Sequence, residues 1–188
     1  MAMRIIGGAS RGLHLALVGD GDAKAHLRPT SDRVREAIFN LLINGGHGNL
    51  VTGARVLDLF AGTGALGLEA LSRGAATATF VDDGAVALAL IRRNIALMRA
   101  EDRTTVIKRD ATKLGDSRGQ GHDLVFLDPP YGMGLGEHAL ANAAAGWIAR
   151  GAVVVWEESA PPKLPEGFDM VDQRRYGDTV VTILKAAT

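Results

Sequence analysis

From residue 54 onward, short apolar segments alternate with helical patterns. The apolar segments, which we expect to be β-strands, cover residues 55–60, 77–82, 104–109, 123–128 and 152–157. Apolar residues at helical spacing occupy three of the intervals, at residues 65–73, 84–99 and 137–149. Because strands separated by helices are joined by right-handed crossovers, this order predicts an α/β fold with a doubly wound, mostly parallel sheet.

Extended segments are also expected at both ends of the chain. Residues 1–30 contain "MRIIG" and "LHLALV" followed by a turn at "GDGD", a pattern that predicts an N-terminal β-hairpin arm. Near the C-terminus, "FDMVDQRRY" and "TVVTILKA" are joined at Gly177 and Asp178, and a hairpin there would add an antiparallel strand to the sheet edge. We therefore expect a hairpin arm at 1–30 and a single domain at 31–188.

A helix is expected between the arm and the first strand, in "SDRVREAIFNLLINGG". Its apolar residues at helical spacing are Val34, Ala37, Ile38, Leu41 and Leu42. We expect Arg33, Arg35 and Glu36 to point away from that apolar face. Thr30 or Ser31 is expected to cap the first turn.

Composition narrows the class of protein. The chain has 188 residues, enough for one core, and no apolar run reaches the roughly 18 to 20 residues that a membrane-spanning helix needs. It has no cysteine, which excludes disulfides and thiolate metal sites and predicts a cytoplasmic protein, and its histidines lack metal-ligand spacing. With 21 basic and 21 acidic residues, a bulk electrostatic grip on nucleic acid is not expected, although a local basic patch is compatible with this balance.

A glycine-rich turn ends the first strand of the alternating pattern. In "VLDLFAGTGALGLEAL", Gly62, Gly64 and Gly67 match G-x-G-x-x-G, a spacing that lets the backbone approach a ligand. This spacing also fits a dinucleotide-binding oxidoreductase, or a turn with no ligand. Asp58 favours a different ligand, because a carboxylate there would repel a pyrophosphate and attract the α-ammonium group of S-adenosylmethionine.

Two further carboxylates close the next two strands. Asp82 could accept both hydroxyls of a ribose, and Asp110 could accept the amino group of adenine while the Ala111 N–H donates to the ring. Each of them alone is equally well explained as a solvated residue at a strand end. Three carboxylates at successive strand ends fit a ligand better, since open α/β sheets bind ligands at that edge.

The stretch "DLVFLDPPYG", residues 123–132, ends a buried strand in a stiff corner. Proline lacks an N–H, fixes its own φ and drives the preceding residue into extended geometry. Asp128 and Pro129 each precede a proline, so the corner offers a carboxylate and backbone carbonyls as acceptors beside the ring of Tyr131. Such a corner suits a flat ligand that carries an amine, and it also fits a loop that merely ends a strand.

Together these motifs resemble class I S-adenosylmethionine-dependent methyltransferases, and more narrowly the bacterial 16S rRNA guanine-N2 methyltransferases of the RsmD type. The matching stretches are "MRIIGG", "RPTSDRVREAIFNLL", "VLDLFAGTGALGLEALSRGA", "FVD", "DLVFLDPPYG" and "YGDT". The resemblance implies a Rossmann-like sheet of seven strands and methyl transfer to the exocyclic N2 amine of a guanine. One departure is "FVDDG", where the family more often has glutamate, a lysine and then an acidic residue; Asp82 keeps the carboxylate, and Gly84 makes the next helix start unusual.

The resemblance also implies roles for individual residues. The implied cofactor-binding residues are Asp58, Phe60, Gly62, Gly64, Asp82, Asp110 and Ala111. The implied catalytic residues are Asp128, Pro129, Pro130 and Tyr131. A guanine amine is a poor nucleophile because its lone pair is delocalised into the ring. The Asp128 carboxylate and the Pro129 carbonyl would accept hydrogen bonds from its two N–H groups and stabilise the charge that grows on nitrogen, while Tyr131 stacks on the base.

The implied substrate is 16S rRNA, within a small ribosomal subunit or an assembly intermediate. Its target base must be unstacked or already splayed before the amine can be reached. The candidate RNA contacts are Arg4, Arg11, Arg28, Arg33 and Arg35. Basic residues only slightly outnumber acidic ones in residues 1–36, so an ordinary solvated helix face explains these arginines almost equally well.

Three other functions are compatible with parts of the pattern. An adenine-N6 methyltransferase acting on DNA or RNA would use the same proline motif, since that motif serves exocyclic amines generally. A nicotinamide oxidoreductase would leave Asp58 and "DPPY" unexplained. A non-catalytic RNA-binding assembly factor would retain the cofactor pocket without the reaction.

Overall fold

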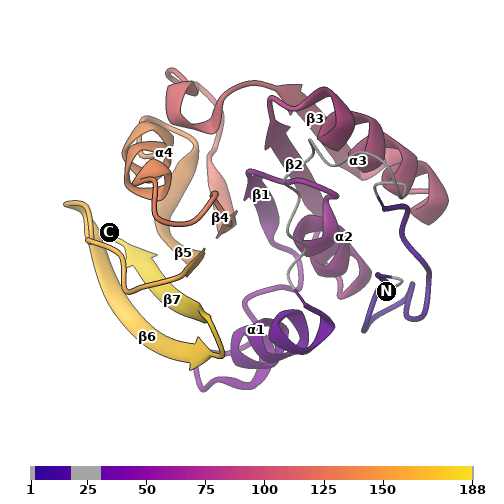
Figure 1. The fold of residues 1–188 in the computed structure, drawn as a ribbon, viewed down its shortest axis with the longest axis horizontal. Coiled ribbons are helices and arrows are strands. Elements are labelled where there is room, and N and C mark those ends of the chain that lie inside the picture. The colour runs from indigo at the N-terminus through magenta and orange to yellow at the C-terminus, as the bar shows by residue number, and fades with distance from the viewer. Residues whose placement is uncertain (1–2, 18–30, 188) are drawn as a thin grey trace.

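The computed structural model describes residues 3–17 and 31–187, and within these residues seven strands form one twisted sheet in the order β3-β2-β1-β4-β5-β7-β6 (Figure 1). The strands are β1 (Arg55–Leu59), β2 (Thr77–Asp82), β3 (Thr104–Lys108), β4 (His122–Leu127), β5 (Ile148–Glu158), β6 (Phe168–Tyr176) and β7 (Thr179–Ala186). Strands β1 to β5 are parallel, and β7 is antiparallel to both β5 and β6. The predicted α/β fold with a mostly parallel sheet is confirmed.

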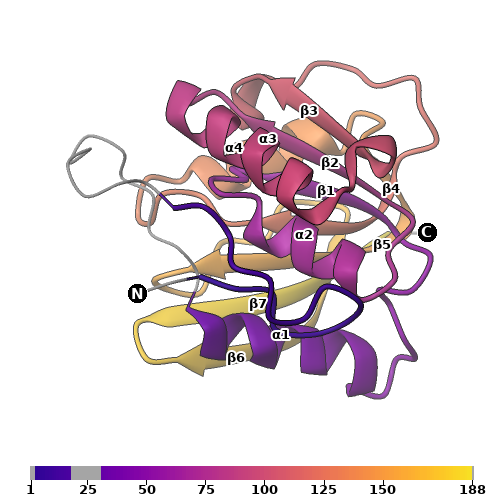
Figure 2. The ribbon, with the colours of Figure 1, turned by 90° about the vertical axis from the view of Figure 1, so that its right-hand side faces the viewer.

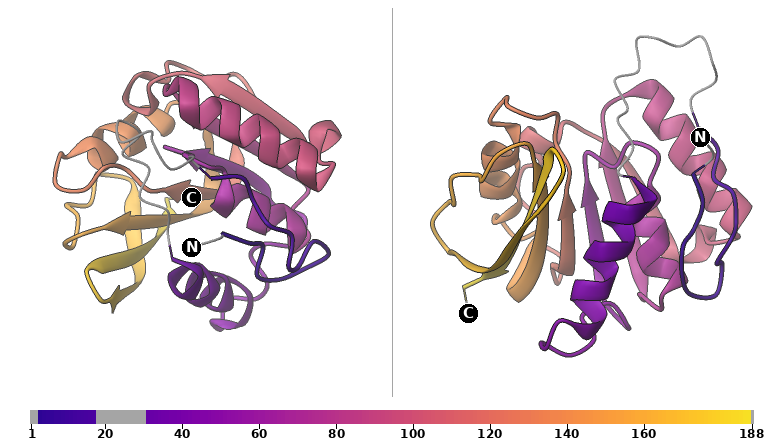
Figure 3. Two further views of the ribbon diagram at one scale, coloured as in Figure 1. Left: turned by 45° about the vertical axis from the view of Figure 1, so that its right-hand side comes forward. Right: turned by 60° about the horizontal axis from the view of Figure 1, so that its bottom comes forward.

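Helices cover both faces of this sheet. The helices are α1 (Asp32–Asn44), α2 (Ala65–Ser72), α3 (Ala85–Met98) and α4 (Leu135–Ala143), with short 3-10 turns η1 (Glu101–Arg103) and η2 (Ala111–Lys113). Helices α1, α2 and α3 bury their apolar residues against one face, while α4 and η2 pack on the other (Figure 3). The two apolar layers bury the central strands on both faces, which is why β4 and β5 contain continuous apolar runs.

The C-terminal hairpin differs from the expectation in one respect. Its turn lies at Gly177 and Asp178 as predicted. However, it contributes two strands to the sheet, because β7 inserts between β5 and β6 and leaves β6 at the edge.

The predicted helix at 137–149 was wrong at both ends. Helix α4 begins at Leu135, directly after Gly134, which has the left-handed backbone (φ 65°). It ends at Ala143, and a turn through Gly146 (φ 91°) leads directly into β5. The left-handed backbone of Gly146 prevents the helix from reaching residue 149, and a Cβ there would meet the Ser117 carbonyl oxygen at 2.1 Å, so this position requires glycine.

At the N-terminus, residues 3–17 form a short antiparallel pair, which we call the N-terminal pair. A bridge between Arg4 and His14 joins its two halves, and backbone bonds link Ile5 to Leu13 and Leu15 to Met3 at 2.9 Å each. The pair runs along the outside of the α2 side of the molecule (Figure 2). The rest of the predicted arm, including the "GDGD" turn and Arg28, lies outside the described residues, so the boundary at residue 30 remains a prediction.

Arg35 does not point away from the apolar face of α1 as expected. Its side chain is fully buried. Its guanidinium donates to the Arg4 carbonyl and to Asp32, and it lies 3.7 Å from the Glu69 carboxylate of α2. Position 35 precedes Ile38 by three residues, so it lies on the apolar stripe of the helix. Burial lowers the pKa of Arg35, and the carboxylates of Glu69 and Asp32 oppose that shift.

Candidate active site

The predicted site residues meet at the edge of the sheet where the parallel strands end. Strand β1 lies between β2 and β4, so the chain leaves β1 in one direction along the sheet and returns on its other side. Open α/β sheets bind ligands at such a switch point. Leu59 and Leu127 are register partners, and the Asp128 N–H lies 3.5 Å from the Leu59 carbonyl oxygen. The turns that follow β1 and β4 are therefore neighbours.

Residues 60–64, which we call the glycine turn, connect β1 to α2 with a left-handed backbone. Phe60 and Gly62 both have φ 58°, and Gly64 has φ 78°. A left-handed conformation is uncommon for an aromatic residue and marks a constrained position. Gly67, one turn into α2, lies so close to β2 that a Cβ there would meet the Phe80 ring at 2.4 Å. The third glycine therefore allows close packing of the helix on the sheet.

Asp58 is a buried carboxylate under this turn. It is 2% exposed, and its Oδ2 accepts the Gly67 N–H at 2.9 Å. Burial raises the pKa of Asp58 well above its ordinary value, the Gly67 bond opposes that shift, and the charges of Asp128 and Asp82 add to it. Three carboxylates from neighbouring strands thus interact at this edge. A cationic group placed among them would relieve their repulsion.

Asp82, the last residue of β2, holds two loops together. One carboxylate oxygen accepts the Gly62 N–H at 2.9 Å, and the other accepts the Gly84 N–H at 2.8 Å. Burial raises the pKa of Asp82, while these two bonds act in the opposite direction. Gly84 is the residue that made the helix start unusual in the sequence, and here its N–H is part of the site.

Asp110 lies at the same edge, after β3. The N–H of its neighbour Arg109 donates to the Asp82 carbonyl at 3.0 Å, which fixes this segment beside β2. The Asp110 carboxylate caps η2 through the N–H and the hydroxyl of Thr112, at 2.8 and 2.7 Å, and these bonds lower its pKa. Ala111 is buried. Capping explains Asp110 structurally, and its role toward an adenine stays a prediction.

The residues after β4, Asp128 to Gly132, form what we call the proline corner. Asp128 and Tyr131 are half-buried, Pro129 is buried, and Pro130 is exposed. The Tyr131 hydroxyl lies 3.2 Å from the Thr179 hydroxyl at the start of β7. This hydroxyl pair connects the aromatic residue of the corner to the C-terminal hairpin.

Glu158, at the end of β5, anchors the same corner and was not predicted. Its carboxylate is buried and accepts the Gly132 N–H at 3.0 Å, together with the N–H and hydroxyl of Ser159. A signal for it exists in the sequence, because "AVVVWEES" ends an apolar strand with two consecutive acidic residues. Such residues lie at the ligand-binding edge of the sheet.

The candidate RNA contacts divide into different environments. Arg4, Arg11 and Arg33 are exposed, and Arg4 makes a long ion pair with Asp32 at 3.8 Å. Arg35 is enclosed by protein, so its predicted contact with RNA is wrong. Arg28 lies outside the described residues.

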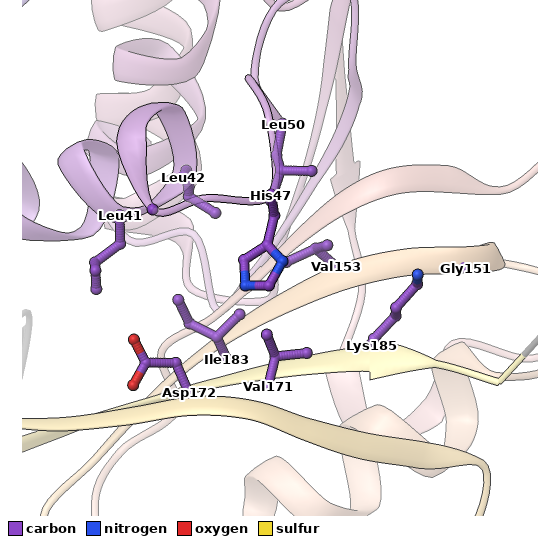
Figure 4. Close-up of a pocket in the computed structure, with 11 residues that line it drawn as sticks. Leu41, Leu42, His47, Leu50, Gly151, Val153, Val171, Asp172, Ile183 and Lys185 are labelled. Carbon is purple, nitrogen blue, oxygen red and sulfur yellow. The ribbon is translucent and has the colours of Figure 1, made fainter.

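A separate pocket of about 210 Å³ contains none of the predicted site residues (Figure 4). It lies between the end of α1 and the sheet, with Leu42 and Ile183 among its apolar walls and with His47, Asp172 and Lys185 also lining it. Its strand residues come from the edge where β4 and β5 begin. It is therefore at the opposite edge of the sheet from the proline corner.

Two kinds of feature are absent from the described part of the chain. Among residues 3–17 and 31–187, no group of three or more histidine, aspartate or glutamate side chains is arranged to hold a metal ion. In the same residues, no helix has both the length and the apolar character to cross a membrane.

Comparison with known proteins places this geometry in context. Residues 3–185 match the family model described as Conserved hypothetical protein 95. The chain is 42% identical to ribosomal RNA small subunit methyltransferase D of Escherichia coli K12, over 93% of this chain and 85% of the relative. It is 39% identical to the putative rRNA methyltransferase YlbH of Bacillus subtilis, over 97% and 98% of the two chains. The solved structure of the putative methyltransferase yhhF from Escherichia coli superposes with a TM-score of 0.82 at 33% identity, covering 100% and 99% of the chains.

Proposed function

The chain belongs to the family described as Conserved hypothetical protein 95, the RsmD-type rRNA methyltransferases, and we propose that it methylates the exocyclic N2 amine of a guanine in 16S rRNA with S-adenosylmethionine as methyl donor. One structural observation carries the proposal. The register of β1 and β4 places the glycine turn beside the proline corner, at the edge where such sheets bind ligands. A methyl donor bound at the glycine turn can thus face an amine bound at the proline corner.

The residues around the glycine turn fit the proposed cofactor chemically. Asp82 is oriented by two backbone N–H groups and keeps lone pairs for ribose hydroxyls, since each carboxylate oxygen can accept two hydrogen bonds. Asp58 supplies negative charge for an ammonium group, and Asp110 with Ala111 would face the adenine. When bound, S-adenosylmethionine supplies an electrophilic methyl group on a sulfonium.

The proline corner would activate the nucleophile. The Asp128 carboxylate and the Pro129 carbonyl would each accept a hydrogen bond from one N–H of the guanine amine, and Tyr131 would stack on the base. As nitrogen attacks the methyl carbon, the carbon–sulfur bond would break and its electron pair would stay on sulfur, giving S-adenosylhomocysteine. Positive charge would grow on nitrogen, where fixed acceptors stabilise it most strongly in the transition state, and the amine would then release one N–H proton to solvent through the Asp128 carboxylate. Pro130 keeps the corner rigid. The in-line alignment of sulfur, methyl carbon and nitrogen would supply the rest of the rate enhancement.

Exposed arginines near the N-terminus would bind the RNA backbone. Arg4 and Arg11 lie on the N-terminal pair and Arg33 on the first turn of α1, and all three are accessible to solvent. The near-neutral net charge fits an enzyme that recognises a preassembled small-subunit particle, where shape helps to position the base. A cytoplasmic location accords with such a substrate.

The competing functions have less support. The named relatives are rRNA methyltransferases, which does not favour an adenine-N6 enzyme acting on DNA or a nicotinamide oxidoreductase. A non-catalytic assembly factor would not require a proline corner with fixed acceptors beside the glycine turn.

Methyl transfer from tritiated S-adenosylmethionine tests the proposal. Deproteinised rRNA and assembled small subunits are offered separately, and the modified nucleotide is mapped and identified by mass. We expect N2-methylguanine in 16S rRNA. N6-methyladenine as the product, or binding of NAD in place of S-adenosylmethionine by calorimetry, would overturn it.

A further inference from the structure

The side chain of Asn94 joins two parts of the molecule that are far apart in sequence. It lies on α3 and is fully buried. Its NH₂ group donates to the Thr63 carbonyl at 2.9 Å and to the Ala16 carbonyl at 3.2 Å, and its Oδ1 accepts the Ala16 N–H at 2.7 Å. Both donors and the acceptor of the amide are therefore in use.

One of these contacts holds the glycine turn. Thr63 lies between Gly62, whose N–H binds Asp82, and Gly64, from which α2 begins. The Thr63 carbonyl belongs to the peptide plane between Thr63 and Gly64, so the bond from Asn94 orients that plane. Asn94 therefore helps to orient the backbone that the cofactor is proposed to approach.

The other contacts hold the N-terminal pair. Asn94 binds both backbone polar groups of Ala16, so any shift of this segment breaks two hydrogen bonds at once. The Thr63 hydroxyl also lies 3.6 Å from the Met3 sulfur, on the other half of the pair. The glycine turn thus contacts one half of this segment directly and is linked to the other half through Asn94.

A second attachment fixes the N-terminal pair at a distance from the glycine turn. The Ser72 hydroxyl, at the end of α2, accepts the Ser10 N–H at 2.9 Å and donates to the Gly7 carbonyl at 2.6 Å. The Glu69 carboxylate accepts the N–H groups of Ile6 and Gly7 at 2.8 Å each. These bonds can hold the segment on the domain without involving the glycine turn.

We infer that Asn94 is a positioning residue that makes cofactor binding and RNA binding depend on each other. The inference rests on the proposed function, because it takes the glycine turn as the cofactor site and the N-terminal pair as an RNA contact. Cofactor binding would restrain Thr63, and through the shared amide it would restrain Ala16. RNA then binds a segment that is already ordered and loses less conformational entropy, so each ligand strengthens the other.

Calorimetry with S-adenosylhomocysteine, which cannot react, measures this coupling directly. The ligand is titrated into the full chain alone and in the presence of saturating assembled small ribosomal subunits. We expect RNA to tighten its binding by about fivefold or more, the lower range of allosteric coupling. In Asn94→Ala that ratio should fall to about one, although each ligand still binds.

Ser72→Ala is the matched control, because it loosens the same segment at the attachment that does not involve the glycine turn. It should keep the coupling ratio of the parent. A second readout does not depend on any variant: S-adenosylhomocysteine should slow amide hydrogen exchange in the peptide around Ala16 of the parent chain. A parent ratio of one, an unchanged ratio in Asn94→Ala, or exchange that the cofactor does not alter would overturn the inference. Failure of the proposed function is distinguishable, since the parent would then neither bind S-adenosylhomocysteine nor transfer methyl groups.

Discussion

The backbone N–H of Gly132 donates to the buried carboxylate of Glu158 across 3.0 Å, and this bond fastens the far end of the proline corner to β5. At the near end, the corner continues directly from β4. The acceptors proposed to activate the amine are therefore held between two adjacent strands of the sheet. We therefore expect Glu158 to fix the geometry of the corner without contacting the substrate.

Replacing Glu158 tests that role. Glu158→Ala removes the acceptor for Gly132, and misplacement of the corner should lower kcat by about 10²-fold, the scale of a 1 Å error in a reacting group. Glu158→Gln keeps an acceptor oxygen and should retain most of the rate. Single-turnover methyl transfer measures both, with the exposed Glu166→Ala as control. Equal rates for Glu158→Ala and the parent would show that the bond has no catalytic consequence.

Asp128 is expected to act mainly in the transition state. Asp128→Ala should lower kcat by about 10² to 10³, the scale of losing one preorganised electrostatic contact, and should leave the Kd for S-adenosylmethionine nearly unchanged. Asp128→Asn keeps an acceptor without the charge, and its kcat should lie between those of the parent and Asp128→Ala. Single-turnover rates, calorimetry and a melting curve separate catalysis from binding and folding. A folded Asp128→Ala enzyme with the parent rate would exclude the proposed mechanism.

The charge of Asp58 should strengthen binding of the cofactor and lower the stability of the folded protein. Burial raises its pKa, so the folded state binds the proton more tightly than the unfolded state, and ionisation destabilises the fold as pH rises above about 4. Asp58→Asn keeps an acceptor for the Gly67 N–H and removes the charge. We expect a higher Tm at pH 7, a difference from the parent that shrinks toward pH 4, and weaker binding of S-adenosylmethionine. A lower Tm at pH 7 would contradict this account.

Arg33 and Arg35 should behave differently although they are two residues apart. Arg33→Ala should raise the KM for RNA and reduce the slope of log K against log salt by about 0.7 to 0.9, the value for one phosphate contact. Arg35→Ala should instead lower the free energy of unfolding by about 1 to 3 kcal/mol, because it leaves the Arg4 carbonyl without its donor, while Glu69 keeps its ion pair with Arg73 at 2.7 Å. Filter binding across a salt series and denaturant unfolding measure the two effects. Arg150→Ala, an exposed arginine near the start of β5, is the control, and a salt slope like the parent's in Arg33→Ala would return that residue to an ordinary solvated position.

The sequence by itself determined the elements and their order. Runs of apolar residues such as those of β1 and β4 mark strands buried on both faces, and glycines and prolines mark the turns that follow, because these preferences act over a few neighbouring residues. The positions of Asp58, Asp82 and Asp128 near the ends of their strands followed from the same local pattern. Their convergence at one edge followed from the parallel topology that the alternation implies.

Only the tertiary structure decided which polar side chains meet. The sequence indicates an exposed charge at Arg35, whereas the structure packs this residue near Glu69 of α2. The sequence indicates only a strand end at Glu158, whereas the structure places Gly132 beside it. The hydrogen-bond partners of Asn94, which are Ala16 and Thr63, are likewise evident only from the structure. These partners are separated by 26 to 78 residues along the chain. A hydrogen bond forms only when donor and acceptor are placed to within a few tenths of an ångström. The packing of whole elements sets these positions, and they leave no periodic pattern in the sequence.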